Sequence, residues 1–248
     1  MSRFVALLSL LIISCGGTAT PEERKPPPQL FSPSSTIKKV VVEIDYGPDA
    51  QPYEGGTLFD ANAERLFRDT GKTFTVQSPT PIDEPTKTSL DVNELLEIAA
   101  RHRDVKNSDA TAGFYVLFVN ARFKDSALQV RDDVLGVSIG NTGVIAMFKP
   151  VIESTKSILT PNLERFVEQT TLTHEFGHAV GLVNNGAPAL ANHHDTEHGA
   201  HCSSEQCVMY WQNEGASAAI EFARKYLTSG NAIVFDADCL ADVDALKK

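Results

Sequence analysis

Residues 160–181, TPNLERFVEQTTLTHEFGHAVG, decide the fold and carry the strongest chemical signal in the sequence. They predict one long helix, because Pro161 suits a first turn, Glu164 suits the positive end of the helix dipole and Gly181 suits a helix end. Apolar residues in and just after this stretch fall on one helix face, which we expect to pack on a sheet. They are Leu172, Phe176, Ala179, Val180 and Val183.

His174 and His178 lie on the opposite side of this helix, four residues apart. That spacing lets two imidazoles bind one Zn²⁺ at about 2.0–2.1 Å. Glu175 is placed to take a proton from metal-bound water without binding the metal itself. A solvated surface pair of histidines is the alternative interpretation.

The pattern His174-Glu175-x-x-His178-x-x-Gly181 resembles the opening of the metzincin consensus HExxHxxGxxH. In metzincins the glycine turns the chain so that a third histidine reaches the zinc. Asn184 stands at that third position here, and a neutral amide is a poor zinc ligand beside imidazole.

Residues 201–209, HCSSEQCVM, resemble the archaemetzincin branch of this family, in which the third histidine precedes Cys, four residues, Cys, one residue and Met. The resemblance implies that His201 is the third zinc ligand and that Met209 is the Met-turn residue beneath the metal. Residues 184–200 are then a 17-residue insertion (201 − 184 = 17).

The resemblance also implies an α+β, metzincin-like zincin fold. We expect a twisted mixed sheet packed on helices in residues 37–183 and a small irregular C-terminal subdomain in 184–248. The implied activity is hydrolysis of peptide bonds by one catalytic Zn²⁺, with Glu175 as general base and residues 143–148 as the edge strand that binds substrate. Archaemetzincins carry a later CxxC that helps to hold a second zinc; only Cys239 follows here, so one ion is expected.

The insertion contains further histidines, namely His193, His194 and His198. Each is a rival third ligand. Alternatively, Asp195 could orient the imidazole of a ligand, or the segment could be a histidine-rich surface loop without a role. Glu197 could instead supply the carboxylate ligand of a gluzincin.

Upstream, strands and helices alternate and a hairpin closes the sheet. Strands are expected at 39–46, 72–77, 114–119, 135–139 and 143–148, and helices at 57–69 and 90–103.

The N-terminus reads as a lipoprotein signal peptide over residues 1–14. Arg3 precedes a short apolar run at 4–13, and the run ends in a lipobox-like ISCG with Cys15 as the lipidated residue. A plain signal peptide is the alternative. Residues 15–36 are rich in proline and are expected to form an extended tether. The predicted location is extracytoplasmic, on a bacterial membrane, facing the periplasm or the cell surface.

Outside the cytoplasm, disulfides persist. The closeness of Cys202 and Cys207 favours a bridge between them, which leaves Cys239 free unless it displaces one of the two.

The 248 residues carry a net charge of −10 without a basic patch, which disfavours a nucleic-acid partner. We expect a monomer that acts on a peptide or protein substrate. The rival functions are a lipid-anchored zinc-binding or zinc-scavenging protein and a catalytically silent module of the same fold.

Overall fold

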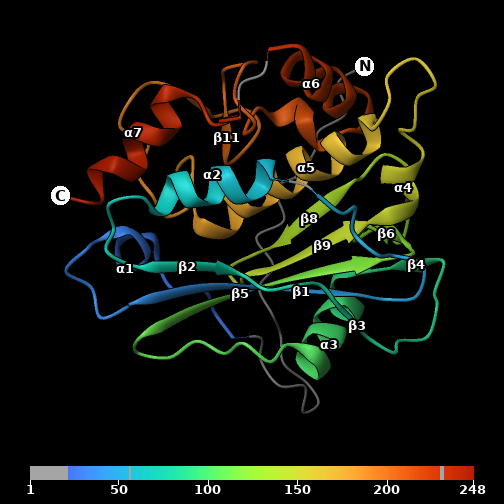
Figure 1. Ribbon diagram of the computed structural model, residues 1–248, viewed down its shortest axis with the longest axis horizontal. Helices are drawn as coiled ribbons and strands as arrows, with labels where there is room; N and C mark the ends of the chain where they lie inside the picture. The colour runs from blue at the N-terminus through green and yellow to red at the C-terminus, as the bar shows by residue number, and fades with distance from the viewer. Residues whose placement is uncertain (1–21, 56, 230–231) are drawn as a thin grey trace.

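The computed structural model describes residues 22–55, 57–229 and 232–248, with a six-stranded mixed sheet at the centre (Figure 1). Its strands are β1 (Lys39–Tyr46), β2 (Thr73–Val76), β3 (Thr80–Pro81), β5 (Thr111–Val119), β8 (Gly136–Ile139) and β9 (Val144–Phe148). The order is β2-β1-β5-β9-β8, with β3 also paired to β1. All pairings are parallel except that of β8 with β9. The expected mixed sheet packed on helices is confirmed.

The hairpin β8–β9 closes one side of the sheet, but β9 is an interior strand between β5 and β8. The expectation that residues 143–148 form the substrate-binding edge is therefore wrong. Every residue of β9 is buried, as an interior strand requires. The edge strand on this side is β8.

Helices cover both faces of the sheet (Figure 1). Helices α2 (Leu58–Phe67) and α5 (Leu163–Val180) lie on one face and α3 (Val92–His102) lies on the other. The C-terminal elements form a further layer over α5, so α5 lies between this layer and the sheet. They are β10 (His194–Asp195), β11 (His201–Cys202), η1 (Trp211–Glu214), α6 (Ala216–Ser229) and α7 (Ala237–Ala245). The remaining elements are α1 (Pro27–Phe31), β4 (Ser89–Leu90), β6 (Arg122–Lys124), β7 (Val130–Arg131) and α4 (Lys149–Glu153).

Phe176 anchors α5 in the core. Its ring meets Phe59 of α2 at 5.3 Å and Phe114 of β5 at 5.2 Å, both edge to face. Such pairs favour one orientation of the helix. The predicted apolar stripe of α5 is confirmed, since each of its members is at most 2% exposed. With this stripe turned to the sheet, His174 and His178 face the C-terminal layer.

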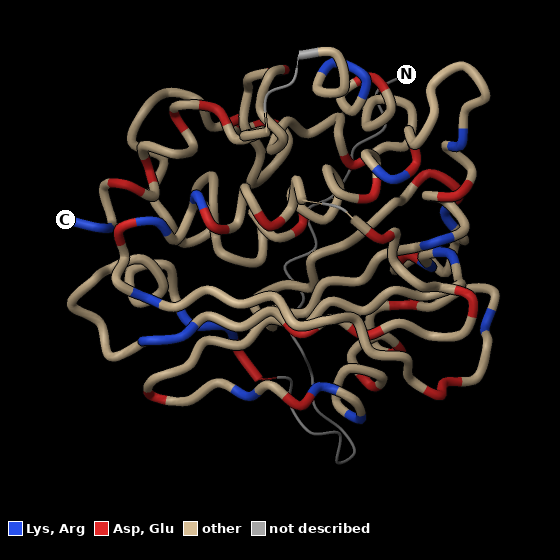
Figure 2. Tube along the Cα trace, in the orientation of Figure 1, with Lys and Arg blue, Asp and Glu red and all other residues tan. Residues whose placement is uncertain are grey.

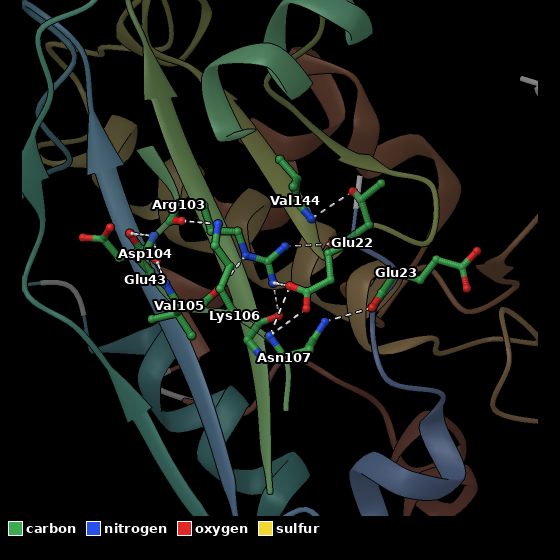
Figure 3. Close-up of polar contacts among 11 residues, drawn as sticks. Glu22, Glu23, Glu43, Arg103, Asp104, Val105, Lys106, Asn107 and Val144 are labelled. Carbon is green, nitrogen blue, oxygen red and sulfur yellow. Dashed lines mark hydrogen bonds and ion pairs between the residues drawn. The ribbon is translucent and has the colours of Figure 1, made fainter. Parts of the chain in front are cut away.

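The N-terminal segment 22–36 packs on the folded domain, so the expected tether is wrong for these residues. Leu30 and Phe31 of α1 are fully buried. Glu22 accepts the backbone N–H of Asn107 at 3.0 Å and lies 3.6 Å from the Arg103 guanidinium (Figure 3). Arg24 donates to the carbonyl of Asn185 at 2.6 Å. The segment thereby covers the turn at which α5 ends.

Residues 1–14 and Cys15 lie outside the described residues. No described helix has the length and apolar character to cross a membrane. Figure 2 shows that acidic and basic residues are spread along the described chain.

Candidate metal centre

Three imidazoles converge between α5 and the C-terminal layer; His174, His178 and His201 are called here the three-histidine cluster. The Nε2 atom of His178 lies 3.0 Å from that of His174 and 3.2 Å from that of His201. Tetrahedral ligands at about 2.0–2.1 Å from Zn²⁺ stand about 3.3 Å apart. The spacing in the structure therefore fits one zinc ion.

Main-chain carbonyls orient two of these rings. The Nδ1 atom of His174 donates to the carbonyl of Val208 at 2.7 Å, and that of His201 donates to the carbonyl of His198 at 2.6 Å. A proton held on Nδ1 leaves the Nε2 lone pair free for a metal. Both rings thus present their ligand nitrogen to the centre of the cluster.

Burial keeps two of the three imidazoles neutral. His174 is 1% exposed, and burial, followed by the nearby His201, lowers its pKa to about 4. Burial also lowers the pKa of His178 well below its usual value. For His201 burial lowers the pKa, but the hydrogen bond and charge of Glu214 outweigh it and raise the pKa. Neutral imidazole is the form that binds metals. The burial of this cluster also excludes the alternative that His174 and His178 are a solvated surface pair.

Glu175 is buried beside the cluster and against β8. Burial, and secondarily the charge of Glu214, raise the pKa of its carboxyl to about 8. The carboxyl accepts a hydrogen bond from the main chain of Ser138, and its Cγ lies close to Gly136. With a pKa of about 8 the group can accept a proton as the carboxylate and return it as the acid.

Met209 packs against α5 and is fully buried. Its sulfur packs against Gly177 so closely that a Cβ added to this glycine would lie 2.3 Å from Sδ. The glycine of HEFGH thus makes room for the methionine.

The insertion histidines lie outside the three-histidine cluster. His198 stacks on Trp211 at 3.9 Å, and His194 binds a main-chain carbonyl. Glu197 is exposed. His193 is buried and belongs to a second cluster.

This second, cysteine cluster consists of His193, Cys202, Asp236 and Cys239, whose donor atoms all lie within 4.8 Å of one another, with Cys207 beside it. The three cysteines are buried free thiols. The expected Cys202–Cys207 disulfide does not form in the structure. His193 Nδ1 lies 3.5 Å from Cys202 Sγ and 3.8 Å from Cys239 Sγ, and the sulfurs of Cys207 and Cys239 are 3.5 Å apart. Hydrogen bonds from the other two thiols lower the pKa of Cys202. Two sulfurs, one imidazole and the Asp236 carboxylate are four donors of the kinds that bind zinc.

Asp242, fully buried in α7, orients His193 from behind. Its carboxylate accepts from His193 Nε2 at 2.8 Å and from the backbone N–H of Leu190 at 2.8 Å. A carboxylate on the far nitrogen of a ligand histidine is the usual support of a metal site.

Sequence reasoning missed Asp242, the Val208 carbonyl and Glu214. The Glu214 carboxylate lies 3.0 Å from His201 Nε2. None of the three belongs to a motif, and the contacts of Asp242 and Val208 with their histidines span 49 and 34 residues. Of these three, Val208 alone lies next to a residue that the sequence singled out, Met209, the predicted Met-turn residue.

The chain matches no protein-family profile and no curated protein. Its structure is similar to the crystal structure of archaemetzincin from Methanopyrus kandleri, with a TM-score of 0.50 and 16% identity over 86% of this chain and 97% of that one. The fold is archaemetzincin-like. A zinc-dependent peptidase from Methanocorpusculum labreanum is also similar, with a TM-score of 0.47 and 14% identity over 82% of this chain and 99% of that one.

Proposed function

We propose that the protein is a zinc-dependent metallopeptidase. The observation that carries the proposal is the convergence of three Nε2 atoms beside the buried carboxyl of Glu175. The archaemetzincin-like fold, which the sequence resemblance also implies, supports it.

The three-histidine cluster would hold the zinc ion. Bound zinc supplies Lewis acidity that activates water and polarises a carbonyl. Glu175 takes a proton from water and returns it to the leaving amine. Since β8 is the edge strand and contacts Glu175, a peptide substrate would add to this edge as a further strand.

The test combines metal analysis with hydrolysis of an unfolded protein. We expect His201→Ala to lose one zinc ion per chain, and Glu175→Gln to keep its zinc but lose hydrolysis by at least about a hundredfold. Glu197→Gln, an exposed carboxylate of the insertion, serves as the control and should change neither property. Hydrolysis retained by zinc-loaded Glu175→Gln would remove the general base from the proposal.

The cysteine cluster fits a second, structural zinc ion, which revises the expected count from one to two. Metal ligation would also account for the free, buried thiols of Cys202 and Cys239. Two ions in the parent and one in His201→Ala is the expected stoichiometry. A single ion in the parent, still lost in His201→Ala, would leave the cysteine cluster without a metal.

A zinc-scavenging protein is the second candidate, because the structure offers two groups of potential ligands. It predicts that both ions exchange readily and that Glu175→Gln changes nothing. A catalytically silent module predicts tight zinc binding without cleavage of any unfolded substrate.

We also propose that residues 1–14 are a signal peptide and that lipid on Cys15 anchors the protein outside the cytoplasm. Mass spectrometry of the mature N-terminus tests this. Cys15→Ser should release the protein from the membrane fraction.

A further inference from the structure

We propose that Glu214 is a fourth protein ligand of the zinc ion in the three-histidine cluster, and that its carboxylate closes the position which water and substrate need. The inference rests on the zinc site proposed above. It describes a resting state that a substrate has to open.

Glu214 contacts Nε2 of His201, the atom that would bind the metal, and not Nδ1 on the other side of the ring. Its Oε1 lies 3.0 Å from His201 Nε2, and one donor atom of Glu214 and of each clustered histidine all lie within 4.8 Å of one another. Carboxylate oxygen is an ordinary zinc ligand at about 2.0–2.2 Å. A structural zinc site has four protein ligands, whereas a catalytic one keeps a position open. Glu214 would supply the fourth.

The exposure of Glu214 fits closure. The Glu214 side chain is 58% exposed, whereas His201 is 8% exposed. Glu214 is therefore the exposed member of this group of four, and water and substrate come to the cluster from solvent.

The residues on either side of Glu214 are both bound to main-chain groups elsewhere in the protein. On one side, Asn213 donates its side-chain amide to the Val208 carbonyl at 3.0 Å, the same carbonyl that orients His174. On the other side, Gly215 pairs antiparallel with Val134 just before β8. The position of Glu214 is thus fixed by its neighbours as well as by its contact with His201.

The pairing of Gly215 occupies the sheet edge immediately before β8, next to the stretch that a substrate would use. The carbonyl of Leu135 accepts from Phe148 of β9 at 2.9 Å, so the backbone groups of Val134 point the other way, out of the sheet. Gly215 meets them there in an extended conformation. Glu214 therefore presents a carboxylate to the cluster, and Gly215 presents one extended residue to the edge, between η1 and α6.

A chelator titration tests the ligation. Two zinc ions should be released in separate steps of the titration. The step that is missing in His201→Ala belongs to the three-histidine cluster. Glu214→Gln should weaken that step by at least about tenfold. Glu221→Gln, an exposed carboxylate of α6 paired with Arg224 at 2.9 Å, is the matched control and should leave it unchanged. Equal zinc affinity in the parent and in Glu214→Gln would overturn the proposal.

A second measurement tests closure without relying on activity. In the cobalt-loaded protein, azide should shift the visible absorption of Glu214→Gln, whose fourth position is open, at concentrations that leave the parent unchanged. Azide binding of equal strength in both would overturn the closing role. If zinc and azide behave as expected but no variant cleaves any peptide, Glu214 remains a ligand and the peptidase proposal fails instead.

Discussion

The substitution Gly177→Ala tests how the zinc helix is supported, because Gly177 lies inside the HEFGH motif without contacting the proposed metal. Its added Cβ would lie 2.3 Å from Met209 Sδ and 3.2 Å from Met209 Cε. Carbon and sulfur in contact stand about 3.8 Å apart. The sulfur therefore has to move by about 1.5 Å in a fully buried site.

Two opposing effects set the size of the change. Overpacking of this kind costs about 1–3 kcal/mol, whereas alanine favours a helix interior over glycine by about 1 kcal/mol. We expect a net loss of about 1 kcal/mol in the free energy of unfolding. The displaced methionine should also weaken zinc binding at the three-histidine cluster.

A double-mutant cycle with Met209→Ala gives the decisive measurement. Met209→Ala alone should cost about 2–5 kcal/mol by leaving a cavity. The added methyl group no longer clashes in the double variant. The loss of stability in the double variant should therefore be smaller than the sum of the two single losses by about 1–3 kcal/mol. Urea unfolding at equal free zinc measures all four proteins. If Gly177→Ala is more stable by about 1 kcal/mol and the coupling is zero, helix propensity alone acts and the close contact is refuted.

Three further predictions concern stability. Asp242→Ala should lose about 2–4 kcal/mol, because His193 and the Leu190 N–H lose their buried acceptor; urea unfolding that matches the parent would contradict these contacts. Glu94→Gln should cost about 1 kcal/mol near neutral pH, since the Asp91 backbone N–H, then Lys87, hold the pKa of Glu94 at about 2. That stabilisation is present above the ordinary pKa and disappears as pH falls towards about 2, so a thermal-shift difference constant with pH would contradict it. Removing metal with a chelator should lower the melting temperature, by the equivalent of about 2.7 kcal/mol when free zinc had been about a hundred times Kd.

The helix of the zinc motif could be predicted from the sequence because its apolar residues repeat with the helical period. Phe176 and its stripe pack on the sheet as expected, and Gly181 ends the helix with a φ of 91°. A side chain at Gly181 would also collide with Pro27. That contact comes from a segment more than 150 residues earlier, and helical periodicity carries no information about it.

The two errors in the folded region have different causes. The continuous apolar run VIAMF was itself a sign of an interior strand, and the mixed GVSI before it suits an edge. In segment 22–36 proline content concealed a short helix. Pro27 and Pro28 occupy its first turn, where proline is tolerated, and the following Leu30 and Phe31 are the apolar pair that it buries.

The cysteine cluster could not be derived from spacing. Cys202 and Cys207 are close in sequence, and that closeness suggested a bridge. The structure instead brings Cys239 to them from α7 and His193 from the insertion. The insertion thus delivers a side chain to the C-terminal layer, a role that its length and its glycine and proline content left open.

Buried polar side chains of α5 differ in their partners, and the hydroxyl of Thr171 has none among the described residues. Glu168 pairs with Lys149 at 2.6 Å, and Gln169 accepts the Phe59 backbone N–H at 3.1 Å, so burial leaves these groups satisfied within the protein. The three-histidine cluster differs, because its Nε2 atoms face one another at 3.0–3.2 Å. The Nδ1 atom of His174 already donates to a carbonyl, so its Nε2 is an acceptor, whereas His201 Nε2 can donate a proton to the Glu214 carboxylate at 3.0 Å. A cation at the centre of the cluster would be shared by all three Nε2 atoms, and this geometry supports the zinc proposal in addition to the motif.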